Sequence, residues 1–190
     1  IGDNSLIRSK SIFYTGSTFG PKLITGHNVT VRENVTAGKN LELGTFSDVQ
    51  GDCEIGDYVK CHSSVHIGKS SKIGSFVWIY PFVVLTNDPT PPSLNRERIT
   101  IENYVVVATS STILPGLTIK EGTVIAAHSK VTKNTKPHTL IAGKPAKEIC
   151  ATFKIKLKND KKISAYPWTK HFHRGYPPEV IKEWKKKFKN

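Results

Sequence analysis

Hydrophobic residues recur at every sixth position through the first 85 residues of the chain. Counted in sixes from Ile1, fourteen of the fifteen residues in one column are hydrophobic, and Thr25 is the exception. The column consists of Ile1, Ile7, Phe13, Phe19, Thr25, Val31, Ala37, Leu43, Val49, Ile55, Cys61, Ile67, Ile73, Ile79 and Leu85. An α-helix repeats about every 3.6 residues and an alternating strand about every two, so neither produces this period. The period of six therefore indicates a repeated structural unit.

Two further positions of the hexad have a restricted composition. The fourth residue after the column is small or aliphatic, as in Ser47, Val59 and Val77. The residue directly after the column is often glycine: Gly2, Gly20, Gly26, Gly38, Gly44, Gly56, Gly68 and Gly74. We expect a short strand that turns a corner, because glycine adopts backbone geometries that a Cβ forbids. Such repetition predicts a parallel β-helix, in which three hexads form one triangular coil and successive coils stack about 4.8 Å apart.

A polar, proline-rich stretch interrupts the repeat at residues 86–100. The column resumes afterwards as Ile101, Val107, Ile113, Ile119, Ile125 and Val131, shifted by four positions from the earlier register. The interruption is therefore predicted to be a loop expelled from one coil of a solenoid of about seven coils.

Composition limits the class of protein. No apolar run approaches the roughly 18 residues needed to span a bilayer, and the amino terminus lacks a basic segment followed by an apolar one. Three cysteines with no metal-type spacing indicate reduced thiols. We expect a soluble, cytoplasmic protein, and its net charge of +13 favours anionic partners.

Two segments carry a resemblance to a known family. The pattern [LIV]-G-x-x-x-x resembles the left-handed β-helix of hexapeptide-repeat acyltransferases. Residues 105–149, with "STILPGLTI" and "AGKPAKEI", resemble the terminal coils and cap of that family. The resemblance implies an all-β, left-handed β-helix domain over residues 1–149. It also implies an acetyl-CoA-dependent transferase, a homotrimer and active sites between neighbouring subunits.

The resemblance also implies where coenzyme A binds. Lysines near the cap can form charge-assisted contacts with its phosphates, and small residues at corners can admit the pantetheine arm. The residues expected to bind the cofactor are Ala108, Ala126, Lys130, Lys133, Gly143, Lys144, Pro145 and Lys147.

The loop sequence "LTNDPTPPS" resembles a loop of acetyltransferases that modify sugars, including nucleotide-linked amino sugars used for surface polysaccharides. Related loops often carry a histidine where this chain has Thr90, which weakens the case for a base in the loop. Asn87 and Asp88 are left as the groups to bind an acceptor hydroxyl or amine.

Acyl transfer from a thioester needs a group that removes a proton from the acceptor, and a neutral histidine is the usual base. His66 is the first candidate because it should lie one coil below Val84, at the root of the loop. His62, at a corner of the same coil, is the second. We favour transfer to the amine of a nucleotide-linked amino sugar, for which binding as the free base could make a strong base unnecessary. The alternative is a sugar O-acetyltransferase with a histidine base.

Two alternatives come from other classes of protein. A zinc carbonic anhydrase would hold its metal with His27, His62 and His66, but His62 and His66 take different corner positions, and we expect no metal. A catalytically inactive β-helix scaffold is the other alternative, since alanine replaces the family's glycine at two corners.

Residues 150–190 lose the period of six and form a basic extension. Val180, Ile181, Trp184 and Phe188 fall on one face of a predicted helix over residues 178–190, among several lysines. The helix is expected to dock on its own trimer or to lie on an anionic membrane surface. Trp168 and the aromatic residues near it could stack on a nucleotide or cover an apolar face of the solenoid. The chain carries no recognised nucleic-acid motif, so nucleic acid is not an expected partner.

Overall fold

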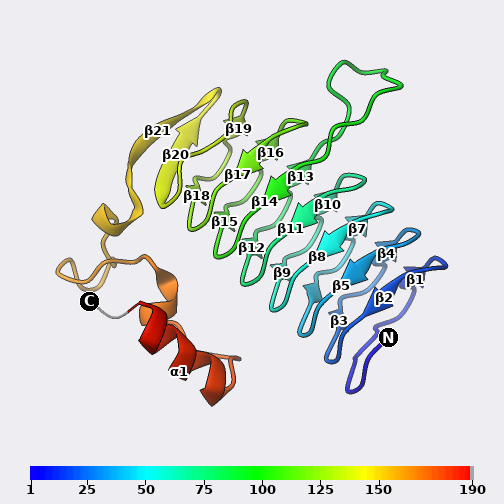
Figure 1. Ribbon diagram of the computed structural model, residues 1–190, viewed down its shortest axis with the longest axis horizontal. Coiled ribbons are helices and arrows are strands. Elements are labelled where there is room, and N and C mark those ends of the chain that lie inside the picture. Colours follow the sequence, from blue (N-terminus) through cyan, green and yellow to red (C-terminus); the bar gives the residue numbers. More distant parts are fainter. Residues whose placement is uncertain (189–190) are drawn as a thin grey trace. The chain divides into compact units, whose positions relative to one another are not determined.

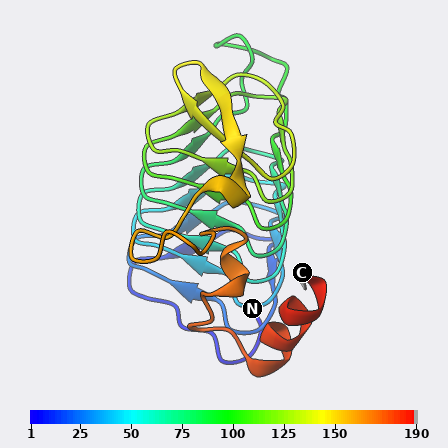
Figure 2. The same cartoon turned by 90° about the vertical axis from the view of Figure 1, so that its left-hand side faces the viewer.

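The computed structural model describes residues 1–188, which form two compact units, one spanning Ile1–Ile149 and the other beginning at Cys150. The first unit is a left-handed parallel β-helix of about seven coils, as predicted (Figures 1 and 2). The coils contribute short strands to three sheets, and the two-residue strands lie parallel to their partners in neighbouring coils.

The three sheets are named here by their first strand. The β1 sheet contains β1 (Ile12–Phe13), β4 (Thr30–Val31), β7 (Asp48–Val49), β10 (His66–Ile67), β13 (Val84–Leu85), β16 (Thr112–Ile113) and β19 (Lys130–Val131). The β2 sheet contains β2 (Thr18–Phe19), β5 (Thr36–Ala37), β8 (Glu54–Ile55), β11 (Lys72–Ile73), β14 (Thr100–Ile101) and β17 (Thr118–Ile119). The β3 sheet contains β3 (Ile24–Thr25), β6 (Glu42–Leu43), β9 (Lys60–Cys61), β12 (Trp78–Ile79), β15 (Val106–Val107), β18 (Val124–Ile125), β20 (Thr139–Gly143) and β21 (Ala146–Ala151).

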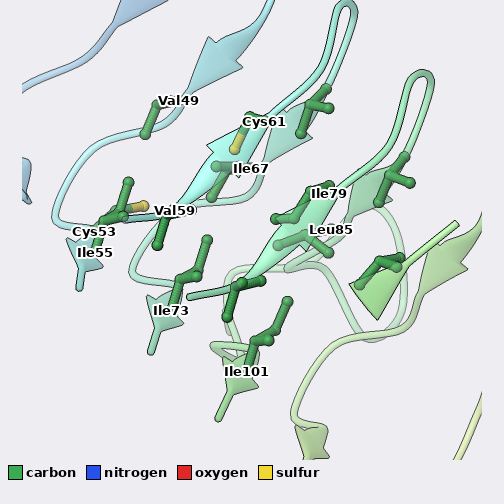
Figure 3. Close-up of a cluster of buried hydrophobic side chains, with 14 of the residues drawn as sticks. Val49, Cys53, Ile55, Val59, Cys61, Ile67, Ile73, Ile79, Leu85 and Ile101 are labelled. Carbon is green, nitrogen blue, oxygen red and sulfur yellow. The ribbon is translucent and has the colours of Figure 1, made fainter. Parts of the chain in front are cut away.

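The second residue of each two-residue strand is the column residue of the sequence, and it points into the coil. Ile67, Ile79 and Leu85 have no exposed surface, and Figure 3 shows such side chains filling the interior of successive coils. The first residue of most two-residue strands is partly or fully exposed on the outer face, whereas Val106 and Val124 are buried exceptions. The two earliest column residues, Ile1 and Ile7, are exposed because they belong to the end coil of the stack, which has a neighbour on one side only.

The corners differ from the sequence-based expectation in one respect. The glycines after the column do not adopt left-handed backbone angles. They are required because the next coil passes too close for a Cβ, which at Gly56 would lie 2.8 Å from the backbone of Gly74. The left-handed angles fall two residues later and are mostly adopted by other residue types, such as Asn28, Phe46 and Tyr58.

The loop leaves the solenoid after β13, where it was predicted, and projects away from the coils (Figure 1). Residues 86–99 connect β13 to β14. Thr100 pairs with Lys72, 28 positions earlier, whereas strand neighbours elsewhere are 18 apart, as Asp48 and His66 are. The coil therefore closes in register despite ten additional residues.

The second unit contains two short 3₁₀ helices, η1 (Thr152–Lys154) and η2 (Trp168–Lys170), and the helix α1 (Pro178–Lys187). An antiparallel bridge between Lys156 and Ser164 joins the two arms of a hairpin. The predicted apolar face of the helix is present, with Val180 and Trp184 buried. Lys189 and Asn190, the end of the predicted helix, lie outside the described residues.

Candidate functional site

His66 and Asp48 form a hydrogen-bonded pair on the outer surface of the β1 sheet. His66 is the first residue of β10 and Asp48 is the first residue of β7. The two residues are direct partners in the parallel pairing of these adjacent strands. His66 Nδ1 lies 3.0 Å from Asp48 Oδ2, and both side chains keep more than a third of their surface exposed. The pair is therefore accessible to a substrate.

The partner of Nδ1 determines what the other ring nitrogen can do. An ionised carboxylate only accepts hydrogen bonds, so Nδ1 carries the proton and Nε2 keeps its lone pair. Within residues 1–188, Nε2 makes no hydrogen bond of its own. Gln50 Nε2 donates to the same Asp48 oxygen at 2.6 Å and so fixes the carboxylate from its other side. This arrangement suits a base that removes a proton from a hydroxyl.

The root of the loop lies directly above this pair in the stack. His66 pairs with Val84, and the loop begins two residues after Val84. A Cβ at Gly68 would lie 2.6 Å from the carbonyl oxygen of Leu85 and 3.4 Å from Asn87 Cβ. The absence of a side chain at Gly68 therefore lets Asn87 approach the strand end that carries His66.

Two hydrogen bonds hold the root of the loop in place. Thr86 Oγ1 donates to the Ile113 carbonyl at 2.9 Å, which attaches the start of the loop to the next coil. The Glu97 N–H donates to the Asn87 carbonyl at 2.9 Å and closes the neck of the loop. Asn87 and Asp88 are thus fixed close to the solenoid, whereas Thr90 is exposed further out.

Asp88 carries an unusual carboxylate. Its Oδ1 is buried and has no hydrogen-bond partner within the described part of the chain, although the residue as a whole is only half-buried. A buried oxygen without a partner is costly unless some group donates to it. Asp88 is therefore prepared to accept a hydrogen bond from a bound molecule.

His62 lies in a different environment from His66. It occupies the corner after β9, where its ring stacks on Tyr80 with centroids 4.6 Å apart, and Trp78 lies at 6.1 Å. Burial lowers the pKa of the His62 imidazole below its ordinary value. His62 thus resembles a packed aromatic residue more than a base held by a carboxylate.

The residues expected to bind coenzyme A do not form one cluster. Ala108 and Ala126 occupy the corner positions after β15 and β18, in the same row as Tyr80 and His62. The backbone of Ala126 is already satisfied, because its N–H donates to Ile141 and its carbonyl accepts from the hydroxyls of Ser111 and Ser129. The contact of Ala126 with the pantetheine arm stays a prediction. Lys130 is exposed on β19, three strands beyond His66 in the same sheet.

The cap residues surround an open pocket at the end of the solenoid. The pocket has a volume of about 330 Å³ and includes Lys133, Lys136, Pro145 and Lys147 in its lining. Lys136 is paired with Glu148 at 3.1 Å, which leaves Lys133 and Lys147 as exposed cations of the pocket. Gly143 ends β20 and Lys144 begins the turn to β21, and both lie outside the lining of the pocket.

The three histidines of the zinc hypothesis have separate partners. His27 Nδ1 lies 2.9 Å from the Ser9 hydroxyl, His62 stacks on Tyr80, and His66 binds Asp48. Among residues 1–188 no group of three or more His, Cys, Asp or Glu side chains is arranged to hold a metal ion.

Asp48 and Gln50 were missed in the sequence analysis. Asp48 precedes His66 by 18 residues, the length of one coil, so the repeat itself could have identified it. Gln50 lies directly after β7, two residues beyond Asp48, and contacts the same carboxylate.

Comparisons with known proteins agree with this fold. No family model matches the chain. The chain is 32% identical over 139 residues to WbbJ of Escherichia coli K12, a putative lipopolysaccharide biosynthesis O-acetyl transferase, covering 64% of this chain and 71% of WbbJ. It is 27% identical over 144 residues to the bifunctional protein GlmU of Streptococcus uberis, covering 76% of this chain but only 30% of GlmU.

Among solved structures, WeeI from Acinetobacter baumannii AYE matches with a TM-score of 0.54 at 18% identity. The match covers 71% of this chain and 56% of WeeI. This likeness establishes a shared fold.

Proposed function

The chain belongs to the hexapeptide-repeat acetyltransferases, and from this membership we propose that it transfers an acetyl group from acetyl-CoA to a hydroxyl of a sugar. The observation that carries the proposal is the His66–Asp48 pair beside the root of the loop. A sugar hydroxyl is a weak nucleophile and needs a base, whereas an amine can react as its free base. The pair therefore shifts our preference from the amine acceptor favoured by the sequence to a hydroxyl.

In the proposed reaction, His66 Nε2 takes the proton of the sugar hydroxyl as that oxygen bonds to the thioester carbonyl carbon. The carbon–sulfur bond then breaks, and the imidazolium returns the proton to the departing thiolate. Asp48 stabilises the imidazolium and keeps the ring oriented without taking the proton itself. The products are an acetylated sugar and free coenzyme A, so atoms and charge balance.

We assign acceptor binding to the loop root. Asn87 is held over Gly68, and Asp88 presents a buried oxygen that can accept a hydrogen bond from a sugar hydroxyl. The relationship to WbbJ, named for lipopolysaccharide biosynthesis, supports an acceptor among the sugars of surface glycans. A nucleotide-linked sugar fits the same assignment.

We assign the phosphates of coenzyme A to lysines of the cap. Lys133 and Lys147 are exposed in the lining of the cap pocket, and Lys130 and Lys144 lie outside it. Lysine is a strong point-charge partner for phosphate. We further expect a homotrimer, in which a neighbouring subunit completes the donor site. Analytical ultracentrifugation of the full chain tests this assembly.

A second candidate is transfer to an amino sugar. The buried Asp88 oxygen favours it, since a carboxylate without a partner can accept from an acceptor amine as well as from a hydroxyl. The two candidates differ in their need for His66, because an amine bound as its free base does not require a strong base.

Thiol release from acetyl-CoA is the decisive assay. The panel comprises free sugars, nucleotide-linked sugars and their 3-amino and 4-amino counterparts. Release with hydroxyl sugars that disappears in His66→Ala supports the proposal. Release with one amino sugar alone, insensitive to His66→Ala, supports the second candidate. Failure of the chain to bind acetyl-CoA in calorimetry would overturn both and favour a scaffold.

A further inference from the structure

The second unit carries most of the net positive charge of the chain. Residues 150–190 contain twelve Lys or Arg and three acidic residues, a formal net charge of +9 out of +13 for the whole chain. The 149 residues of the β-helix unit therefore account for only +4. Such a concentration of charge attracts an extended anionic surface.

Five of these cations belong to one hairpin, defined here as residues 153–164. The Leu157 N–H donates to the Ile163 carbonyl at 3.0 Å, and the Ala165 N–H donates to the Ile155 carbonyl at 2.7 Å. Lys154, Lys156, Lys158, Lys161 and Lys162 are all exposed, and none forms an ion pair within the described part of the chain. The hairpin thus presents cations with no internal partner.

The same hairpin exposes large apolar side chains. Phe153 keeps 61% of its surface exposed and Ile163 keeps 48%. Both residues are next to lysines in the sequence. Ser164 Oγ donates a hydrogen bond to the Phe153 carbonyl at 2.8 Å, so the two ends of the hairpin lie side by side. Exposed apolar groups surrounded by lysines are typical of surfaces that meet the headgroup region of a bilayer.

The helix α1 differs from the hairpin in this respect. Trp184 is buried and contacts Trp168 and Tyr176, with ring centroids 5.2 and 4.7 Å apart. Val180, on the same face, is also buried. Two residues of the apolar face that the sequence analysis offered to a membrane, Val180 and Trp184, are therefore already covered, and Ile181 and Phe188 are half-buried. The helix α1 thus offers a membrane mainly the charges of its exposed lysines.

We propose that the lysine-rich hairpin binds the surface of an anionic membrane. Its lysines contact lipid phosphates, and Phe153 and Ile163 enter the interfacial region between the headgroups. No helix among the described residues is long and apolar enough to cross a bilayer. Nucleic acid fits less well, since an aliphatic side chain such as Ile163 offers no ring to stack on a base.

Flotation of the full-length chain with vesicles tests the proposal. Vesicles of phosphatidylcholine containing about 30% phosphatidylglycerol should bind the protein, and vesicles of phosphatidylcholine alone should not. Raising the salt from about 0.05 to 0.5 M should release it, because screening shortens the reach of the lysines. Replacing the five hairpin lysines by glutamine should lower the partition constant on the order of 100-fold or more.

The apolar contribution separates a membrane from other polyanions. Phe153→Ser with Ile163→Ser keeps every charge, and we expect it to lower partition about 10-fold. Phe82→Ser is the matched control, because Phe82 is also 61% exposed but lies in the β-helix unit, and it should leave partition unchanged. Equal binding of the double variant and the original chain would overturn the proposal, as would tighter binding to single-stranded RNA than to the anionic vesicles. The salt titration needs no variant and remains informative if a variant fails to fold.

Discussion

His66 lies one coil above Asp48, and the two side chains meet at 3.0 Å between Nδ1 and Oδ2 because the parallel register places their strands side by side. The distance is typical of an N–H···O hydrogen bond. A histidine with such a partner is oriented before any substrate arrives.

The first prediction concerns this pair. His66→Ala should lower kcat with a hydroxyl acceptor about 10²–10⁴-fold, since it removes the base. Asp48→Asn should lower kcat by a smaller factor and leave the KM for acetyl-CoA unchanged, because it disturbs only the orientation and charge of the ring. Steady-state kinetics across pH 6–9 measure both effects.

Asp52→Asn is the matched control for this pair. Asp52 lies on a neighbouring corner, where it binds Asn34 and Lys69 and not His66. Equal losses in Asp48→Asn and Asp52→Asn would mean that the effect of Asp48 is structural.

The second prediction concerns the space beneath the loop. Gly68→Ala would place a methyl group 2.6 Å from the Leu85 carbonyl, so the loop root must move. We expect a loss of about 1–3 kcal/mol in the free energy of unfolding and a higher KM for the acceptor. In Gly51→Ala the added Cβ would lie 3.1 Å from its nearest neighbour. This substitution should lower the free energy of unfolding by less than Gly68→Ala does and leave the KM for the acceptor unchanged. Urea unfolding and acceptor kinetics provide the comparison.

The third prediction concerns the core column. Ile79 has no exposed surface, and Ile79→Ala should lower the free energy of unfolding by about 2–5 kcal/mol. Ile12, on the outer face of β1, is 55% exposed. Ile12→Ala should therefore lower the free energy of unfolding by less than about 1 kcal/mol. Similar losses at both positions would contradict the assignment of the inner and outer faces.

The fourth prediction concerns the thiols. Burial raises the pKa of Cys53 to about 11 and that of Cys61 to about 12, and both side chains are almost fully covered. The thiolate is the reactive form, so neither should react with a thiol reagent at pH 8 in the folded protein. Cys150 is half-buried and should be the one thiol per chain that reacts in the folded protein. Unfolding in urea should raise the number of reactive thiols per chain to three. Cys150→Ser should abolish the reaction of the folded protein with the reagent.

The fifth prediction concerns pH. Because burial lowers the pKa of His62, the unfolded chain binds this proton more tightly than the folded chain does. Stability should therefore fall as the pH drops through the ordinary histidine value near about 6.5, and should level off below the pKa of the folded state. His62→Phe keeps a ring against Tyr80, and it should reduce the decrease in the free energy of unfolding between pH 7.5 and pH 5. Identical slopes for the two proteins would show that His62 does not cause the dependence.

The period of six was sufficient to predict the inner column, the number of coils and the place of the loop, because a buried position tolerates few residue types. Outward positions tolerate many, so the sequence proposed His66 without its partner Asp48. The glycines were predicted at the right positions for the wrong reason, since their role depends on the distance to the next coil. The second unit has no repeat, and whether Trp184 faces solvent or Trp168 depends on contacts that no local pattern specifies.

The coil that expels residues 86–99 recovers its register immediately, with Thr100 on Lys72 and Ile101 on Ile73. The entropic cost of closing a loop grows only slowly with its length. During evolution, this segment can therefore lengthen, shorten or be exchanged while the hydrophobic interior stays unchanged. Under the proposed role of the loop in acceptor binding, acceptor choice and thermodynamic stability can then diverge under separate selection, which is one route by which a single solenoid can come to serve many substrates.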